Sequence, residues 1–321
     1  MRFSFFTSSS SRIAAAAALL GMLMPLMGCN PPAPEGDAAP TGAAMTSETG
    51  TGEAPTSTAG RLVIEGSDTV LPLSQKWADE FKKKNPSADI TVSGGGSGQG
   101  ITSLLNGTTD IANASRPAKD EEKEKAKEKG FELYETAVAR DGITIVVHPT
   151  NPVKSLTVEQ LARIYAGQVR NWKDVGGPDL PITTNGRDTS SGTYAFFQED
   201  VLAKLGKETK YRTDMSTNPS NNKIAENVAS QKGGIGYIGV AYASEFTEAG
   251  KVKEVPIAFA EGQEALLPTS ENVMSGKYPI SRALFNYTRN APEGTAKEYL
   301  DYVTSPEGQE IVKAEGYIAL K

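Results

Sequence analysis

Three short stretches of polar, glycine-rich sequence carry most of the side chains that could bind a ligand. They are EGSDTVLP from residue 65, GGGSGQG from residue 94 and GRDTSSGTYAFF from residue 186. Each is expected at a turn from a strand into a helix, where unpaired N–H groups and the positive end of the helix dipole favour an anion. One stretch alone is commonly structural, since serine, threonine and glycine also form caps and turns. Three in one chain, one of them with Arg187, indicate a shared anion site.

The glycine-rich stretch at residues 94–100 fits neither common nucleotide-binding motif. A dinucleotide fingerprint needs Gly-x-Gly-x-x-Gly, but its third glycine position falls on Gln99 or Ile101. A P-loop needs lysine directly after its last glycine, and Ile101 follows Gly100 here. The formal net charge of −6 and the lack of a basic stripe also argue against nucleic acid as a partner.

The pattern of apolar residues predicts alternating strands and helices around the three stretches. Residues 61–67 have the β-branched pattern of a strand, and Leu73, Trp77 and Phe81 then recur every four residues, as on one face of a helix. The same order of strand, loop and helix repeats around each of the other two stretches. Such alternation is typical of α/β layers whose strands are largely parallel.

Several helix boundaries can be predicted from cap residues. Thr69 is expected to be the N-cap of the first helix, and Thr157 with Gln160 has the spacing of a capping box for a helix that stops at Gly167. The mixed-charge run KDEEKEKAKEKG is expected to form a solvated helix face that ends at Gly130.

The amino-terminal segment has the composition of a lipoprotein signal. Arg2 and Arg12 give it a positive start, and IAAAAALLGMLMPLM supplies an apolar core that is short for a stable membrane span. It ends in LMGC, where Cys29 follows Leu26 and Gly28 as in the bacterial lipobox. We therefore expect cleavage before Cys29 and lipidation of its thiol, since two or more acyl chains give stable anchoring.

Cys29 is the only cysteine, so no internal disulfide can form in an extracytoplasmic protein. The alternative is an ordinary signal-peptidase site that happens to precede a cysteine. Residues 1–28 are thus predicted to be the signal peptide. Residues 29–60, rich in Pro, Ala, Thr and Gly, are predicted to form a flexible tether because they have few large apolar side chains.

Residues that could catalyse a reaction are few. His148 is the only histidine, and no metal-ligand companion stands at a suitable spacing from it. Ser97 and Ser191 lack the Gly-x-Ser-x-Gly elbow of a serine hydrolase. These observations favour binding over catalysis, predict neither metal nor cofactor, and leave a phosphate-ester hydrolase as the rival class.

Six longer stretches occur in a consistent order between Arg61 and Lys321. They are GSDTVLPLSQKWADEF, GGGSGQGITSLLNGTTDIANASRP, DGITIVVHPTNPVKSLTVEQLARIYAGQVRNWKDVGG, GRDTSSGTYAFF, GGIGYIGVAYA and TSPEGQEIVKAEGYIAL. Taken together, they resemble a known family, the phosphate-binding subunits of bacterial ABC phosphate importers.

This resemblance implies an α/β protein with a type 2 periplasmic-binding-protein fold, in which two α/β lobes are joined by a two-segment hinge. The first lobe would take residues 61–140 and 251–321, and the second lobe would take residues 141–250. The family also implies a monomer outside the cytoplasm, in the periplasm or at the outer cell surface, that delivers inorganic phosphate to an ABC permease. Sulfate, molybdate and arsenate are the alternative ligands.

The family's phosphate contacts carry over to eight positions of this sequence. They are Thr69, the Val70 amide, Ser97, Asp110, Arg187, Ser191, Gly192 and Thr193. Asp110 would accept a proton from phosphate, and it would thereby reject sulfate, which has none to donate. Family members often have an acidic residue two places after the arginine, but Thr189 stands there and Asp188 is one place after. Asp68, next to Thr69, is expected to face away from the anion.

Overall fold

The structure, a computed structural model, describes residues 60–320 of the 321-residue chain. The predicted signal peptide, the predicted lipidation site Cys29 and all but the last residue of the predicted tether (29–60) lie outside the described residues. No helix within residues 60–320 is long and apolar enough to cross a membrane.

Strands and helices alternate along the described chain, as the apolar pattern predicts. The strands are β1 (Arg61–Gly66), β2 (Asp89–Ser93), β3 (Ile111–Ala114), β4 (Leu133–Val147), β5 (Leu156–Thr157), β6 (Thr183–Arg187), β7 (Ser216–Asn218), β8 (Gly234–Gly239), β9 (Lys253–Val255), β10 (Ile257–Ala258) and β11 (Ser281–Arg289). The helices are α1 (Leu71–Lys84), α2 (Ser97–Asn106), α3 (Asp120–Glu128), α4 (Val158–Tyr165), α5 (Gly192–Asp200), α6 (Asn221–Ser230), α7 (Val240–Glu248), α8 (Ser270–Met274), α9 (Gly294–Thr304) and α10 (Pro306–Ala314). Two 3₁₀ helices are η1 (Trp172–Val175) and η2 (Leu202–Leu205).

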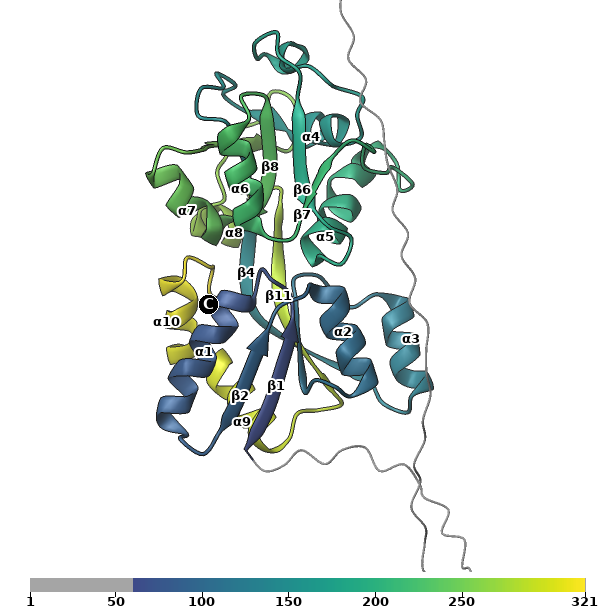
Figure 1. Ribbon diagram of the computed structural model, residues 1–321, viewed down its shortest axis with the longest axis vertical. Helices are drawn as coiled ribbons and strands as arrows, with labels where there is room; N and C mark the ends of the chain where they lie inside the picture. The colour runs from purple at the N-terminus through teal and green to yellow at the C-terminus, as the bar shows by residue number, and fades with distance from the viewer. Residues whose placement is uncertain (1–59, 321) are drawn as a thin grey trace, which may run out of the picture. The chain divides into compact units, whose positions relative to one another are not determined.

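Two long strands, β4 and β11, join two lobes (Figure 1). In the first lobe β1 pairs in parallel with β2 and β3, and in the second lobe β6 pairs in parallel with β7 and β8. Residues 133–142 of β4 pair with β11, whereas residues 143–147 pair with β8. The predicted α/β architecture of two lobes and two crossing segments is therefore confirmed.

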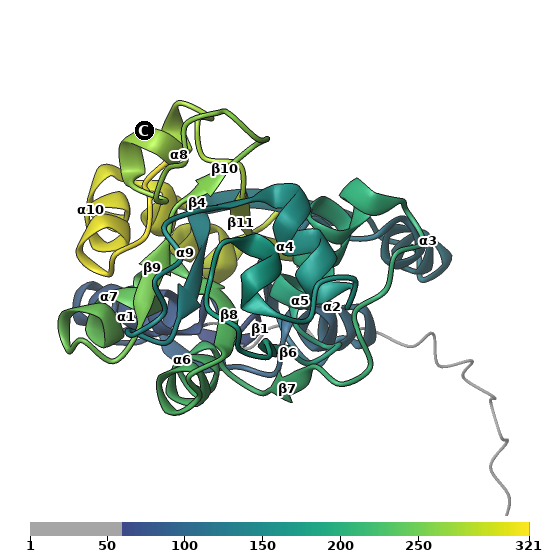
Figure 2. The same ribbon diagram turned by 90° about the horizontal axis from the view of Figure 1, so that it is seen from above.

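Helices cover both sides of the strands in each lobe (Figures 1 and 2). In the first lobe α1 lies on one side and α2 and α3 lie on the other, and in the second lobe α6 and α7 lie opposite α4 and α5. The inner strands β3 and β8 are accordingly buried along their whole length, whereas β2 at the edge of the first lobe is mostly exposed or half-buried.

The hydrophobic clusters bear on where the lobes divide. The large cluster of the second lobe also takes in residues that follow position 250, namely Val255, Ile257, Val273, Tyr278 and Ile280. We therefore propose that the second lobe runs to about Ile280, and that the first lobe takes up the chain again at β11 instead of at residue 251.

Local capping agrees with the sequence at α4 and differs at α1. The capping box of α4 is formed, because Thr157 Oγ1 accepts the Gln160 N–H at 3.1 Å and Gln160 Oε1 accepts the Thr157 N–H at 2.8 Å. In α1, however, the N-cap residue is Val70 and no side chain caps the helix. The prediction that Thr69 caps α1 was wrong, and its hydroxyl faces Thr193 of the other lobe instead.

Trp77 ties the first and last helices of the first lobe together. Its ring is fully buried, and its indole N–H donates to the Gly308 carbonyl of α10 at 2.8 Å. Because α1 begins directly after the first polar stretch, this contact helps to hold that stretch in place.

Candidate anion-binding site

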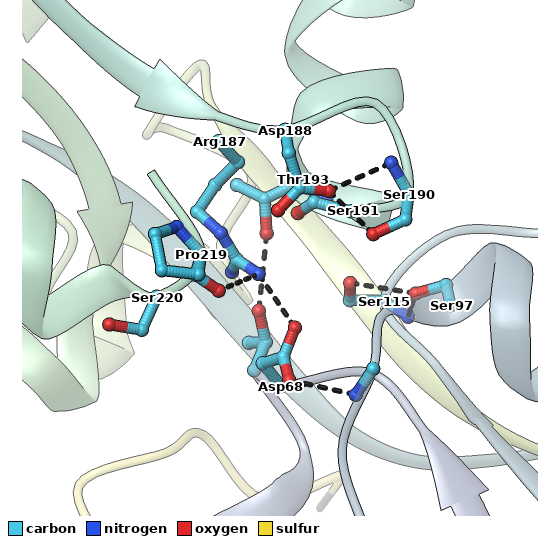
Figure 3. Close-up of polar contacts among 12 residues, drawn as sticks. Asp68, Ser97, Ser115, Arg187, Asp188, Ser190, Ser191, Thr193, Pro219 and Ser220 are labelled. Carbon is cyan, nitrogen blue, oxygen red and sulfur yellow. Dashed lines mark hydrogen bonds and ion pairs between the residues drawn. The ribbon is translucent and has the colours of Figure 1, made fainter. Parts of the chain in front are cut away.

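The three polar stretches follow the carboxyl ends of parallel strands, and the structure brings them together where the lobes meet. Asp68 and Thr69 follow β1, Ser97 begins α2 after β2, and Ser115 follows β3. In the second lobe Arg187 ends β6, and residues 188–193 follow it. Ligands of open α/β sheets bind at this edge, and Figure 3 shows these side chains gathered from both lobes.

Arg187 is the last residue of β6, and its side chain is only 1% exposed. Its Nη2 donates to Asp68 Oδ2 at 2.6 Å and to the Pro219 carbonyl at 2.9 Å. Its backbone N–H donates to the Tyr237 hydroxyl at 3.2 Å. Nε of Arg187 is buried and has no hydrogen-bond partner within residues 60–320. The guanidinium is therefore held in place through Nη2, and its buried Nε–H is left to donate to a ligand.

Asp68 is the carboxylate of this site. One of its oxygens accepts from Arg187 in the second lobe, and the other accepts the Gly95 N–H at 3.0 Å. The expectation that Asp68 faces away was wrong, because the turn after β1 directs its side chain toward Arg187 (Figure 3). Asp188, by contrast, accepts from the Ser190 N–H at 2.9 Å and does not support Arg187 among the described contacts.

Buried hydroxyl groups from both lobes surround the ion pair. Thr69 Oγ1 lies 3.1 Å from Thr193 Oγ1, and Ser97 Oγ lies 3.2 Å from Ser115 Oγ. The Ser191 hydroxyl accepts the Thr193 N–H at 3.1 Å, as the N-cap of α5. A hydroxyl can donate to an anion once its lone pairs are occupied by protein donors.

Glycines let the backbones of the two lobes approach each other closely. A Cβ on Gly96 would lie 2.6 Å from the Ser190 carbonyl oxygen, and Gly96 also has a φ of +93°. A Cβ on Gly192 would lie 2.3 Å from Ser97 Oγ. The Gly98 N–H donates across the contact to the Ser190 oxygen at 3.2 Å. Any side chain at Gly96 or Gly192 would therefore push the lobes apart.

Two helices start at this contact, one from each lobe. Ser97 is the first residue of α2 and Gly192 is the first residue of α5. Each start places the positive end of a helix dipole where the lobes meet; the Gly98 and Thr193 N–H groups already donate to Ser190 and Ser191, and the other first-turn N–H groups are those that could reach an anion. The arrangement is rich in donors and favours a small anion.

Arg282 also belongs to this polar cluster around Arg187, although the sequence analysis did not identify it. The two N–H groups of its Nη2 are shared among three acceptors: Asp141 Oδ2 at 3.0 Å, Thr193 Oγ1 at 2.8 Å and Thr69 Oγ1 at 3.3 Å. Arg282 and Asp141 are direct partners in the pairing of β11 with β4, and both are buried. Burial raises the pKa of Asp141, against the attraction of Arg282, and burial also lowers the pKa of Arg282.

The structure does not bring Asp110 to this cluster. Its Oδ2 accepts the Val63 N–H at 2.7 Å, and its own N–H donates to the Val63 carbonyl at 2.9 Å. Asp110 precedes β3 whereas Ser115 follows it, so the two residues are about 16 Å apart along an extended strand. The carboxylate that pairs with Arg187 in the cluster is Asp68, at the opposite end of the sheet.

Six of the other seven residues that were expected to contact the anion lie in this cluster. Thr69, Ser97, Arg187, Ser191, Gly192 and Thr193 all lie in the cluster. The Val70 N–H, however, donates to the Ser67 carbonyl at 3.0 Å within its own turn. Ser115 is an additional member, and its position directly after β3 is the signal that could have found it.

The chain is similar in sequence to known binding proteins. A family model described as a PBP superfamily domain matches residues 51–307. The phosphate-binding protein PstS of Staphylococcus epidermidis is 37% identical over 261 residues, which cover 79% of this chain and 77% of that protein.

Solved structures are similar as well. One, from Clostridium perfringens, is described as a phosphate ABC transporter substrate-binding protein with bound phosphate; it is 34% identical, with a TM-score of 0.70, over 81% of this chain and 100% of that one. Another is an ABC-type phosphate transport receptor from Vibrio cholerae. It is 30% identical, with a TM-score of 0.65, over 80% of this chain and 99% of that one.

Proposed function

This chain belongs to the PBP superfamily and, within it, to the PstS family of phosphate-binding proteins, and we propose on that basis that it captures inorganic phosphate between its lobes and delivers it to an ABC importer. The type 2 periplasmic-binding-protein fold predicted from the sequence agrees with this family. The observation that carries the proposal is the donor-rich cluster around buried Arg187, to which both lobes contribute.

Phosphate would find donors on every side of this cluster. Arg187 Nε, the hydroxyls of Thr69, Ser97 and Thr193, and the first N–H groups of α2 and α5 would reach its oxygens. Hydrogen bonds that involve a charged partner each contribute about 1.5–3 kcal/mol. A few of them support micromolar or tighter binding, which corresponds to about 8 kcal/mol or more after the costs of ordering.

Asp68 would select the ligand by its proton. Phosphate near neutral pH still carries a proton that it can donate to a carboxylate, whereas sulfate does not. Since Asp68 bonds to both Arg187 and the Gly95 N–H, its carboxylate is held beside the ligand donors. An anion without a proton would meet an unmatched negative charge there, which would disfavour sulfate. We therefore assign to Asp68 the role that the sequence comparison had given to Asp110.

The close contact of the lobes favours inorganic phosphate over its esters. Gly96 and Gly192 leave no room for a side-chain atom where they meet Ser190 and Ser97, so an ester group would keep the lobes apart. Ligand contacts to both lobes would drive closure. Catalysis lacks support as well: His148 pairs with Thr150 through a 2.8 Å contact, at the end of β4.

We extend the proposal to the chain's location. Lipidation of Cys29 and a flexible tether up to residue 60 would keep the binding domain near the membrane that holds the importer. The mature protein would act outside the cytoplasm as a monomer without enzymatic activity.

Calorimetry with inorganic phosphate tests this function. We expect stoichiometric binding of phosphate, weaker binding of arsenate and molybdate, and little binding of sulfate. A chromogenic phosphate ester incubated with the same protein should not be turned over. Turnover of the ester would support a hydrolase, and tight sulfate binding without phosphate binding would assign the protein to another oxyanion.

A further inference from the structure

Arg282 and Asp141 form a buried ion pair where the two crossing strands meet. The side chains are 2% and 0% exposed, and Arg282 Nη2 lies 3.0 Å from Asp141 Oδ2. The guanidinium also lies over the ring of Phe196, with 5.4 Å between its central carbon and the ring centroid. Arg282 is therefore held from two directions before any ligand is considered.

The same guanidinium touches one threonine from each lobe. Its Nη2 is 3.3 Å from Thr69 Oγ1, in the turn before α1, and 2.8 Å from Thr193 Oγ1, in the first turn of α5. The two threonine oxygens are 3.1 Å apart. One cation thus contacts the two hydroxyls that the proposed function places on the ligand.

The chemistry of these groups determines which atom donates the hydrogen bond and which accepts it. A guanidinium can only donate hydrogen bonds, whereas a hydroxyl can donate or accept. When Arg282 donates to a threonine oxygen, that oxygen acts as an acceptor toward the arginine, and its own O–H is left to donate elsewhere. One of the two O–H groups can donate to the other threonine across their 3.1 Å contact, so one is left for an anion, and both are left once the anion replaces that contact.

We propose that Arg282 is a positioning residue that holds Thr69 and Thr193 as donors to the anion, and that Asp141 moderates the positive charge which the anion meets. The proposal rests on the proposed function, because it assumes that the ligand is an oxyanion between the lobes. A role in stability alone is the alternative, since Arg282 and Asp141 also pair β11 with β4.

The positioning role and a purely structural role predict different changes in phosphate affinity for one substitution. Asp141→Asn keeps the size of the side chain and removes its negative charge. The unliganded protein should then unfold at a lower temperature, because a buried Arg282 loses its counter-ion. Phosphate should bind as tightly as before or up to about tenfold more tightly, because the full charge of Arg282 acts on the anion. A purely structural pair would lower stability and affinity together.

Arg282 itself is tested by two substitutions. Arg282→Gln should weaken phosphate binding by about 30-fold or more, because a buried charge and the donor to both threonines are lost. Arg282→Lys keeps the charge but not the planar fork, so it should restore part of that loss. If Arg282→Gln does not fold, Arg282→Lys carries the test by itself, with an expected loss of about threefold to tenfold.

A double-mutant cycle separates positioning from a general effect of charge. Thr193→Val removes one of the two hydroxyls and keeps the shape of the side chain. If Arg282 acts through this hydroxyl, Thr193→Val should cost less affinity in the Arg282→Gln background than in the wild type. Additive losses would overturn the positioning role.

Arg289→Gln is the matched control. Arg289 lies at the other end of β11, where it donates to the Leu104 and Leu105 carbonyls at 2.7 and 3.1 Å. Removing its charge should lower stability and leave phosphate affinity within about twofold, because it lies seven positions along the strand from Arg282, a distance of about 23 Å.

Calorimetry with phosphate and thermal unfolding without it supply both readouts for every variant. The inference is supported if the wild type binds phosphate, Arg282→Gln binds it more weakly, and Asp141→Asn binds it at least as tightly as the wild type. The inference is overturned, and the proposed function stands, if the wild type binds phosphate and Arg282→Gln has an affinity within about threefold of it. The same holds if Asp141→Asn binds phosphate as weakly as Arg282→Gln does. No phosphate binding by the wild type overturns both.

Discussion

Gly192→Ala is expected to weaken phosphate binding by keeping the lobes apart. The added Cβ would lie 2.3 Å from Ser97 Oγ, whereas ordinary contacts begin at 3.4 Å. Rotation of the Ser97 hydroxyl alone cannot relieve the clash, because Ser115 Oγ would still be 2.5 Å away and the Ser97 Cβ 3.0 Å away. The lobes would therefore separate locally by about 1 Å, the difference between the clash and an ordinary contact.

A separation of that size breaks the bonds between the lobes. The 2.6 Å contact of Arg187 with Asp68 and the 3.2 Å bond from Gly98 to Ser190 would both exceed hydrogen-bonding distance. Their loss costs the closed form about 2–4.5 kcal/mol, taking about 1.5–3 for the charged bond and about 0.5–1.5 for the neutral one. Phosphate affinity should then fall by about 30-fold to 2000-fold.

Calorimetry with phosphate measures this loss, and Gly98→Ala is the matched comparison. A Cβ on Gly98 would lie 3.5 Å from the Ser190 oxygen, which is an ordinary contact, so its affinity should stay within about threefold of wild type. Both glycines lie in the first turn of a helix, so both variants should fold. The reasoning is refuted if Gly192→Ala binds phosphate as tightly as Gly98→Ala.

Three further predictions concern selectivity, stability and location. Asp68→Asn should lower the ratio of phosphate to sulfate affinity by about 100-fold or more, because the proton acceptor is lost; an unchanged ratio in competition titrations would remove Asp68 from this role. Trp77→Phe should lower the free energy of unfolding by about 1–3 kcal/mol in urea titrations, because the buried Gly308 carbonyl loses its donor, and should leave phosphate affinity unchanged. Cys29→Ser should release the protein from the membrane fraction of cells, and retention there would contradict lipid anchoring through this residue.

Much of the cluster could be predicted from the sequence because its signals are local. Each polar stretch follows a β-branched run and precedes a helical one, so its place at a strand-to-helix turn depends only on neighbouring residues. Parallel strands then carry such turns to one edge of each sheet. This is why Ser97, Arg187 and Thr193 meet in the structure although about 90 residues separate the first two.

Two features depended on information that local patterns do not contain. The choice between Asp68 and Asp110 depends on the end of the strand at which each lies, and Asp110 precedes β3 while Asp68 follows β1. Arg282 reaches the cluster only through the pairing of β11 with β4. Its one sequence signal is that Arg282 would share a strand face with Ile280 and Leu284, where an apolar side chain is expected.

The glycines of residues 94–100 serve three different contacts, so they should not be equivalent. A Cβ on Gly94 would lie 2.5 Å from Asp68 Oδ1, one on Gly96 would lie 2.6 Å from the Ser190 oxygen, and one on Gly100 would lie 2.6 Å from the backbone of β1. The first position controls the site carboxylate, the second controls the approach of the other lobe, and the third controls the packing of α2 on its own sheet. The bare backbone is thus required as much by the protein's own closure as by the approach of an anion.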